Sequence, residues 1–252
     1  MPEFPDLKIT VGDDHVAVVE IDRPPHNYFS LELIRSLADA LTALDGDPNA
    51  RAVLLCSNGK SFCAGADFSE PQDMSGSTYR EAVRLFSNQK PIVAAIQGAA
   101  VGGGFGLSLL ADLRVAAPEA RFWANFSRLG FHHGFGLTVT LPAIVGQQVA
   151  LDMLLTARRI SGEEALAVGL CDRLAPLDGL REEAHSLALE IARGGPLAIP
   201  SIRATMRGDL AQRVKEATDH ELEIQAQLIE TADFAEGVKA MNERRLPDFR
   251  GV

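Results

Sequence analysis

The stretch Gly-Ala-Ala-Val-Gly-Gly-Gly-Phe-Gly at residues 98–106 follows the apolar segment 92–96 and decides the fold class of this chain. A short apolar run that ends in a glycine turn is typical of a buried strand leading into a helix. The first turn of a helix leaves backbone N–H groups unpaired at the positive end of the helix dipole. Residues 98–106 therefore predict a helix start whose amides can hold a developing negative charge.

A second glycine turn, Phe-Cys-Ala-Gly-Ala-Asp at residues 62–67, precedes this one. Two such turns can hold one oxygen atom between them and so form an oxyanion hole. The alternative for either turn alone is that its glycines only permit close packing of a helix on a strand. A nucleotide-binding turn is a third interpretation, but residues 98–106 are not followed by G-K-[ST], and Leu107 replaces the last glycine of a G-x-G-x-x-G fingerprint.

Around these turns, β-rich segments alternate with stretches of helical periodicity, which predicts an α/β fold. Apolar residues between Leu33 and Leu44 recur at helical spacing. The predicted strands are 15–21, 52–56, 92–96 and 113–117.

From Gly146 onward the pattern becomes mainly helical. Ser161 and Glu164 form a capping box ahead of a short helix that ends at Gly169. Two prolines, Pro196 and Pro200, predict an interruption before the C-terminal helices. We therefore divide the chain into an α/β core at 1–195 and a helical region at 196–252. The other predicted elements are helices at 137–145 and 147–157, a strand at 170–174 and helices at 202–231 and 234–245.

Composition excludes several functional classes. The chain has 252 residues, 46% of them hydrophobic, and a formal net charge of −10, which repels nucleic acid and anionic membrane surfaces. Its three cysteines, Cys56, Cys63 and Cys171, favour neither a disulfide framework nor a metal site. We expect Cys63, which lies in an apolar setting, to be a packed residue rather than a nucleophile. No leader sequence or membrane span is expected, so we predict a cytoplasmic protein.

The two glycine turns, followed by Leu-Ala-Asp at 110–112, resemble the crotonase, or enoyl-CoA hydratase/isomerase, family. Arg23-Pro24, the segment 154–170 and the ending 242–249 extend this resemblance. It implies a crotonase-like spiral of ββα units and a helical C-terminal region that builds a homotrimer or a dimer of trimers. It also implies an acyl-CoA thioester substrate, as in fatty acid metabolism, with no metal and no cofactor beyond coenzyme A as part of the substrate.

The resemblance assigns roles to individual residues. The backbone N–H groups of Ala66 and Gly103 would bind the thioester carbonyl oxygen. Residues implied near coenzyme A are Arg23, Ala64, Arg244 and Arg245. For Arg244 and Arg245, a position at a solvated helix end is an almost equally good explanation. Residues implied in the acyl pocket are Phe105, Gly106, Phe126 and Phe131, although any one of these phenylalanines is more often simple core.

This sequence departs from the family at two positions. Hydratases of the family use two glutamates, and the corresponding positions here fall on Gly106 and Phe126. Neither residue can deprotonate water or protonate a carbon, so ordinary hydration is a poor expectation. Carbon–carbon cleavage, decarboxylation and thioester hydrolysis fit an oxyanion hole without paired carboxylates. We therefore expect a lyase, isomerase or hydrolase.

His132 and His133, on the turn at 130–136, are the best candidate acid–base groups. Histidine titrates near neutrality, and a nearby helix N-terminus favours its neutral form. The resemblance places His133 nearest a tyrosine that other family members use. The alternative is that either histidine satisfies backbone groups or packs at a subunit contact. For the whole protein, the alternative to an enzyme is a non-catalytic acyl-CoA binding or carrier protein.

Overall fold

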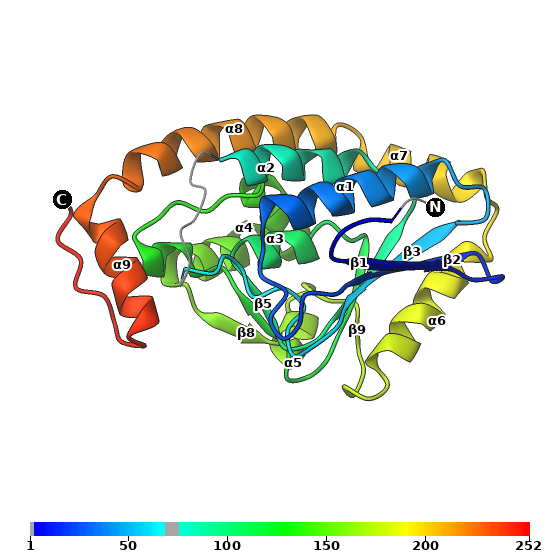
Figure 1. Cartoon of the computed structure of the whole chain (residues 1–252), viewed down its shortest axis with the longest axis horizontal. Helices are drawn as coiled ribbons and strands as arrows, with labels where there is room; N and C mark the ends of the chain where they lie inside the picture. The colour runs from blue at the N-terminus through cyan, green and yellow to red at the C-terminus, as the bar shows by residue number, and fades with distance from the viewer. Residues whose placement is uncertain (1–2, 69–75) are drawn as a thin grey trace.

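The computed structural model describes residues 3–68 and 76–252, and within these the strands form two sheets (Figure 1). In the larger sheet, order β1-β2-β3-β4-β6-β9, only the β1–β2 pair is antiparallel. Its strands are β1 (Leu7–Val11), β2 (Val16–Ile21), β3 (Ala52–Ser57), β4 (Ile92–Ile96), β6 (Leu113–Ala116) and β9 (Arg173–Leu174). The smaller sheet contains β5 (Ala99–Val101), β7 (Arg121–Trp123) and β8 (Arg159–Ser161).

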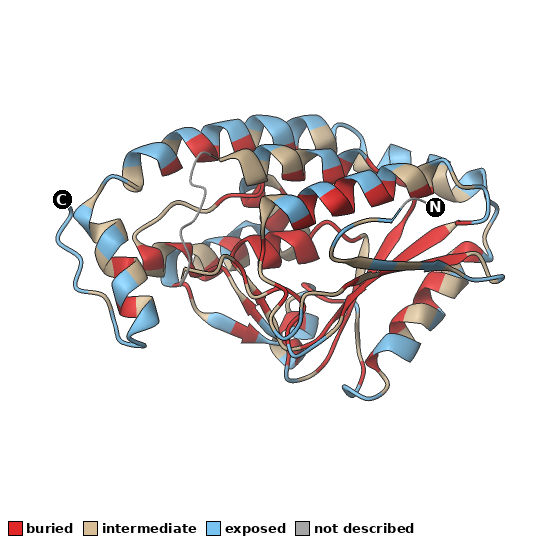
Figure 2. Ribbon diagram, in the orientation of Figure 1, coloured by how far each residue is buried: buried red, intermediate tan, exposed pale blue. Residues whose placement is uncertain are grey.

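The larger sheet is buried on both faces, because its central strands alternate between two apolar clusters. Val53 and Leu55 of β3 face one cluster, together with α1 (Leu31–Asp45). Leu54 and Cys56 face the other cluster, together with α6 (Leu180–Ala192). Figure 2 shows the buried sheet between these helices. Continuous apolar strands of this kind are expected in a parallel sheet covered on both sides.

The chain passes from one sheet to the other and then into a helix, and it repeats this path. Strand β4 leads into β5 and then α3 (Gly103–Ser108), and β6 leads into β7 and then η2 (Asn125–Leu129). Strand β3 leads to Cys63, which pairs with Ala100 in a parallel bridge before α2 (Ser77–Ala82) and η1 (Val83–Ser87). The predicted α/β spiral of ββα units is confirmed.

The C-terminal residues form three helices rather than the two predicted. These are α7 (Ala198–Arg207), α8 (Leu210–Leu228) and α9 (Ala232–Asn242). The predicted helix at 202–231 is wrong because Gly208, at φ +52°, separates α7 from α8. Pro200 does not mark a break, because it lies in the first turn of α7, where a missing N–H removes no helical bond. The boundary after residue 195 falls between α6 and α7.

Helix α4 (Leu137–Thr156) bears on the expectation that the chain has no membrane span. Among the described residues it is the one helix long and apolar enough, by length and composition alone, to cross a membrane. Gly146, at φ +78° and ψ 158°, is not helical and divides α4 into the two segments predicted from the sequence. Each segment has about half of the ~20 residues that a membrane span needs. Because Leu137, Leu141 and Met153 pack in the main core, we interpret α4 as a core helix.

Of two smaller predicted elements, a helix cap is found as expected and a strand is shorter than expected. Ser161 Oγ accepts a hydrogen bond from the N–H of Glu164, as the capping prediction required, at the start of α5 (Gly162–Ala167). The strand predicted at 170–174 is only the two-residue β9, because Leu170 and Cys171 donate their N–H groups to the end of α5.

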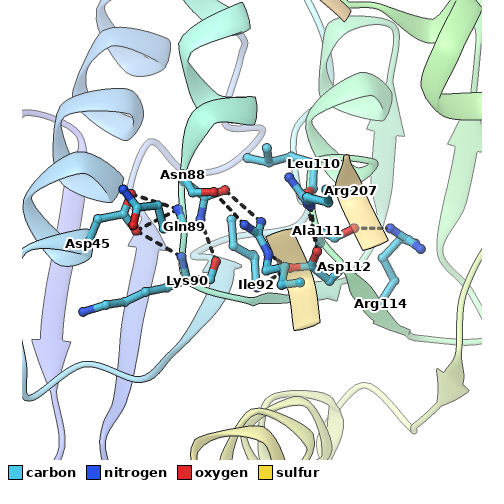
Figure 3. A network of polar contacts seen from close by, with 11 residues as sticks. Asp45, Asn88, Gln89, Lys90, Ile92, Leu110, Ala111, Asp112, Arg114 and Arg207 are labelled. Atoms are coloured by element: carbon cyan, nitrogen blue, oxygen red, sulfur yellow. Dashed lines mark hydrogen bonds and ion pairs between the residues drawn. The ribbon is translucent and has the colours of Figure 1, made fainter. Parts of the chain in front are cut away.

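Asp112 connects the helical region to the sheet (Figure 3). Its carboxylate accepts bonds from the N–H of Ile92 at 2.8 Å, Arg203 Nε at 2.8 Å and Arg207 Nε at 2.9 Å. Arg203 also donates to the carbonyl and side-chain oxygens of Asn88. Both arginines come from α7, so this network fixes α7 against the end of β4.

We predict that Asp112→Ala lowers the free energy of unfolding by roughly 2–4 kcal/mol, somewhat below the ~3–5 kcal/mol of a fully buried pair. The Arg203 side chain is only 8% exposed and would lose its carboxylate partner. Urea unfolding monitored by circular dichroism measures the change. The control is Asp219→Ala, which breaks an exposed pair with Lys215 and should cost at most about 0.5 kcal/mol. Equal effects of the two substitutions would contradict this assignment.

Candidate functional site

The two glycine turns lie side by side. The N–H of Cys63 donates to the carbonyl of Ala99 at 3.0 Å, and the N–H of Val101 donates to the carbonyl of Cys63 at 3.0 Å. Beyond this seam, the N–H groups of Ala66 and Gly103 have no hydrogen-bond acceptor among residues 3–68 and 76–252. Gly103 is the first residue of α3, where an unpaired N–H is expected. The site thus offers two uncommitted backbone donors on adjacent segments.

Glycine is required where the two turns touch. A Cβ on Gly104 would lie 2.2 Å from the carbonyl oxygen of Cys63, and one on Gly65 would lie 2.8 Å from that of Val101. Gly65 also has φ +84°, which side chains rarely adopt. Cys63 itself is fully buried, and this burial raises its pKa to about 12, so it is a packed thiol as predicted.

A phenylalanine fills the space beside Gly106. A Cβ on Gly106 would lie 2.6 Å from Cγ of Phe135, whose side chain is 1% exposed. The ring of Phe135 also packs against the rings of Phe29, Tyr79 and Phe86, at centroid distances of 5.6, 6.2 and 5.9 Å. Phe29 in turn covers Gly103, since a Cβ there would lie 3.1 Å from its ring. An aromatic cluster thus lies beside the first turn of α3.

The predicted acyl-pocket residues do not form one group. Phe105 is fully buried and packs on Phe122 in the main core. Phe126 is 5% exposed and belongs to the same core. Phe131 packs on Phe234 of α9, with centroids 4.9 Å apart. Only Gly106 lies against the aromatic cluster.

The two histidines stack on each other, with ring centroids 4.1 Å apart. Nδ1 of His132 lies 2.7 Å from the carbonyl oxygen of His133, and Nε2 of His133 lies 2.9 Å from Oγ1 of Thr138. Burial, and secondarily the neighbouring His132, lower the pKa of His133 to about 4. His133 is therefore neutral at pH 7 and can accept a proton.

Sequence reasoning missed the residues of α8 that hold this turn. The carboxylate of Glu221, fully buried, lies 3.8 Å from Nε2 of His133 and accepts bonds from Thr138 and Gly136. The side-chain amide of Gln225 donates to the carbonyl of His132 at 2.8 Å. One signal was available, because Glu221 and Gln225 lie at helical spacing from the apolar Val214 and so share its buried face.

The predicted CoA-binding residues are placed as follows. Arg23 donates to Ser30 Oγ at 2.6 Å and lies 3.6 Å from a carboxylate oxygen of Asp6. The N–H of Ala64 donates to the carbonyl of His26. Arg245 pairs with Glu236 and Glu243, so its cationic head is already neutralised.

Arg244 and Arg245 line a cavity of about 720 Å³, whose wall also includes Trp123, Arg128 and Arg159. A second cavity, of about 470 Å³, lies between α2, α8 and Phe131. Neither of these two cavities is lined by Ala66, Gly103 or Arg23.

Comparison with known proteins gives a consistent result. A sequence model of the enoyl-CoA hydratase/isomerase family matches residues 12–252. The (E)-benzylidenesuccinyl-CoA hydratase of Thauera aromatica is 35% identical over 95% of this chain and 97% of that protein. The crotonyl-CoA hydratase of Syntrophomonas wolfei is 32% identical over 94% of this chain and 95% of that protein. A crystal structure of an enoyl-CoA hydratase/isomerase from Pseudoalteromonas atlantica superposes with a TM-score of 0.86, at 31% identity, covering 97% of this chain and 100% of that chain.

We predict that Gly106→Ala destabilises the protein by roughly 1–3 kcal/mol, because the new methyl group overlaps the buried ring of Phe135. In Phe135→Gly, which removes the Cβ and Cγ atoms that the new methyl group would meet at 2.7 and 2.6 Å and suits the φ of +64° at this position, the same change should cost clearly less. Urea unfolding of the two single variants and the double variant measures this coupling. Additive effects would show that the ring does not occupy the space beside Gly106.

We predict that His133 stays neutral down to about pH 4, as followed by NMR titration of its ring. The unfolded chain takes up this proton near pH 6.5, and the folded protein does so only near pH 4. The contribution of neutral His133 to the free energy of unfolding is therefore fully present above about pH 6.5 and is lost as the pH drops toward 4. His133→Gln should remove that part of the pH dependence, and an unchanged profile would count against the depressed pKa.

Proposed function

The chain belongs to the enoyl-CoA hydratase/isomerase family, and on this premise we propose that it is an enzyme that converts an acyl-CoA thioester. In this proposal the thioester carbonyl oxygen accepts hydrogen bonds from the N–H groups of Ala66 and Gly103. The observation that carries the proposal is that both donors lack protein acceptors in the described chain while the Cys63–Ala100 bridge holds their turns together.

Such a pair of donors stabilises an oxyanion. When a bond at the α-carbon breaks, its electron pair moves onto the carbonyl oxygen as an enolate. When a nucleophile adds to the carbonyl carbon, the oxygen becomes the alkoxide of a tetrahedral intermediate. In both cases the two hydrogen bonds strengthen as negative charge develops, so they lower the barrier more than they favour substrate binding.

Hydration of a double bond is disfavoured by the residues beside this site. The chain has Gly106 and Phe126 at the two positions where hydratases of the family carry glutamates, and neither has a titratable side chain. Phe135 also occupies the space into which a side chain at position 106 would extend. A reaction that needs one acid–base group is favoured instead, as in carbon–carbon cleavage, decarboxylation or thioester hydrolysis, with neutral His133 as the candidate group.

The proposal includes a homotrimer or a dimer of trimers in the cytoplasm. Its support is that α7 carries apolar side chains in solvent, since Ile202 and Met206 are 59% and 82% exposed, and Leu197 just before it is 87% exposed. Apolar exposure of this kind is typical of a surface that packs against another subunit.

The function is tested by incubating the protein with a panel of thioesters and following products by mass spectrometry. The panel contains crotonyl-CoA, a β-keto acyl-CoA, a malonyl-type CoA and a saturated acyl-CoA. We expect cleavage, decarboxylation or hydrolysis of one class and little hydration of crotonyl-CoA. Tight binding by calorimetry with every thioester left intact would identify a non-catalytic carrier, and rapid hydration of crotonyl-CoA would refute our interpretation of Gly106 and Phe126.

For the thioester class that is converted, we predict that Ala66→Pro lowers kcat about 10²–10³-fold, because proline lacks the N–H donor. Ala66 lies outside the helices and strands, and its N–H makes no bond that the substitution would break in the described structure. Ala66→Ser retains the N–H and is the matched control. Thermal unfolding of both variants checks that the fold is intact, and equal activity of the two would remove Ala66 from the oxyanion hole.

A further inference from the structure

Glu221 is a buried carboxylate whose hydrogen bonds all lead to the histidine turn and the start of α4. Oε2 accepts the N–H of Gly136 at 2.8 Å, and Oε1 accepts the N–H of Thr138 at 3.0 Å and its hydroxyl at 2.7 Å. The side chain is fully buried. Burial raises its pKa, while the three donors from Gly136 and Thr138 act in the opposite direction by stabilising the ionised form.

The bonds to Glu221 fix the direction of the hydrogen bond between Thr138 and His133. An ionised carboxylate only accepts hydrogen bonds, so Thr138 gives its single hydroxyl proton to Glu221. The Thr138 oxygen, 2.9 Å from Nε2 of His133, must then accept from that nitrogen. In neutral His133 the proton therefore resides on Nε2, and Nδ1 carries the free lone pair.

His132 is held as the opposite tautomer. Its Nδ1 lies 2.7 Å from the carbonyl oxygen of His133, which can only accept, so Nδ1 of His132 carries the proton. Gln225, one helical turn after Glu221, donates to the carbonyl of His132. Helix α8 therefore holds both residues of the histidine pair, one through a side chain and one through the backbone.

A purely structural role for Glu221 accounts for only part of this arrangement. A carboxylate at the N-terminus of α4 caps the helix through the backbone N–H groups of Gly136 and Thr138. The hydroxyl of Thr138 is not needed for that cap. Two further bonds, from His133 to the Thr138 hydroxyl and from that hydroxyl to Glu221, are not required by the cap.

We propose that Glu221 and Thr138 are positioning residues that hold His133 as the tautomer whose basic nitrogen is Nδ1. The inference deepens the proposed function and rests on it for the use of that nitrogen. In the reaction, Nδ1 takes a proton from the substrate or from a water molecule that attacks it, and Nε2 keeps its own proton. The ring becomes an imidazolium, and Glu221, 3.8 Å from Nε2, stabilises the positive charge without taking the proton.

The titratable groups around His133 come from three elements. His132 stacks on it from the same turn, and Glu221 faces it from α8. Tyr79 of α2 lies behind Glu221, and burial and the Glu221 carboxylate raise the pKa of this phenol, which stays neutral. Among these groups, Glu221 is the carboxyl group that faces the histidine pair, and it is the one hydrogen-bonded to Thr138.

The test compares Thr138→Val with Thr138→Ser. Valine keeps the backbone cap of Glu221 and removes the hydroxyl, whereas serine restores the hydroxyl. The first readout is the ¹⁵N NMR spectrum of His133, which distinguishes protonated from unprotonated ring nitrogens and needs no substrate. The second is kcat with the thioester found active, measured as a function of pH. Thr205→Val, on the exposed face of α7, is the matched control for the same chemical change outside the site.

We expect the wild type and Thr138→Ser to show protonated Nε2 and free Nδ1, and Thr138→Val to lose this preference. Thr138→Val should lower kcat between about 10-fold and 10⁴-fold, the range that loss of an orienting partner of histidine costs in other enzymes. In His133→Ala the valine substitution should have no further effect on kcat.

Protonated Nδ1 in wild-type His133, or identical spectra and kcat for the valine and serine variants, would overturn the inference. If no thioester is converted by any variant while the spectra change as expected, the positioning of His133 is supported and the proposed function fails. The two conclusions are therefore separated by the same set of proteins.

Discussion

The parallel bridge between Cys63 and Ala100 is the contact on which the site depends. It joins two successive units of the spiral at the points where each unit leaves the larger sheet. The N–H groups of Cys63 and Val101 donate the hydrogen bonds of this bridge. The N–H groups of Ala64 and Gly102 bind the carbonyls of His26 and Trp123, whereas those of Ala66 and Gly103 have no acceptor in the described chain. For Gly103 the reason is that it begins helix α3. The fold produces these free donors as a by-product of its path, and side-chain identity enters only through the need for small residues.

The sequence was informative where structure follows from local constraints. The glycines at 65 and 104 permit a backbone approach that any side chain would block, and Ser161 caps α5 because its Oγ accepts a bond from the N–H of Glu164, three residues later. Continuous apolar runs such as Ala52–Ser57 allow few alternatives to a buried strand. These features predicted the α/β core and both turns without knowledge of any distant contact, whereas the spiral of ββα units was implied by the family resemblance.

The missed features depend on contacts far apart in the chain. Strands β7 and β8 are three residues each and pair polar positions such as Arg121 and Ser161, so their sequences show no strand pattern. Glu221 lies in a polar, strongly charged stretch, where its helical spacing from Val214 indicates burial but not its partners, because the amides it binds are 83 and 85 residues away. Phe135 is an equally non-local case, because only the folded chain shows that its ring fills the space beside Gly106.

The distance in sequence between Glu221 and the turn it anchors has a consequence for biosynthesis. The amides of Gly136 and Thr138 bind a carboxylate that is synthesised more than 80 residues later. A chain that ends before α8 would lack the carboxylate that binds these amides, so the anchoring of the histidine turn depends on synthesis of the chain as far as Glu221.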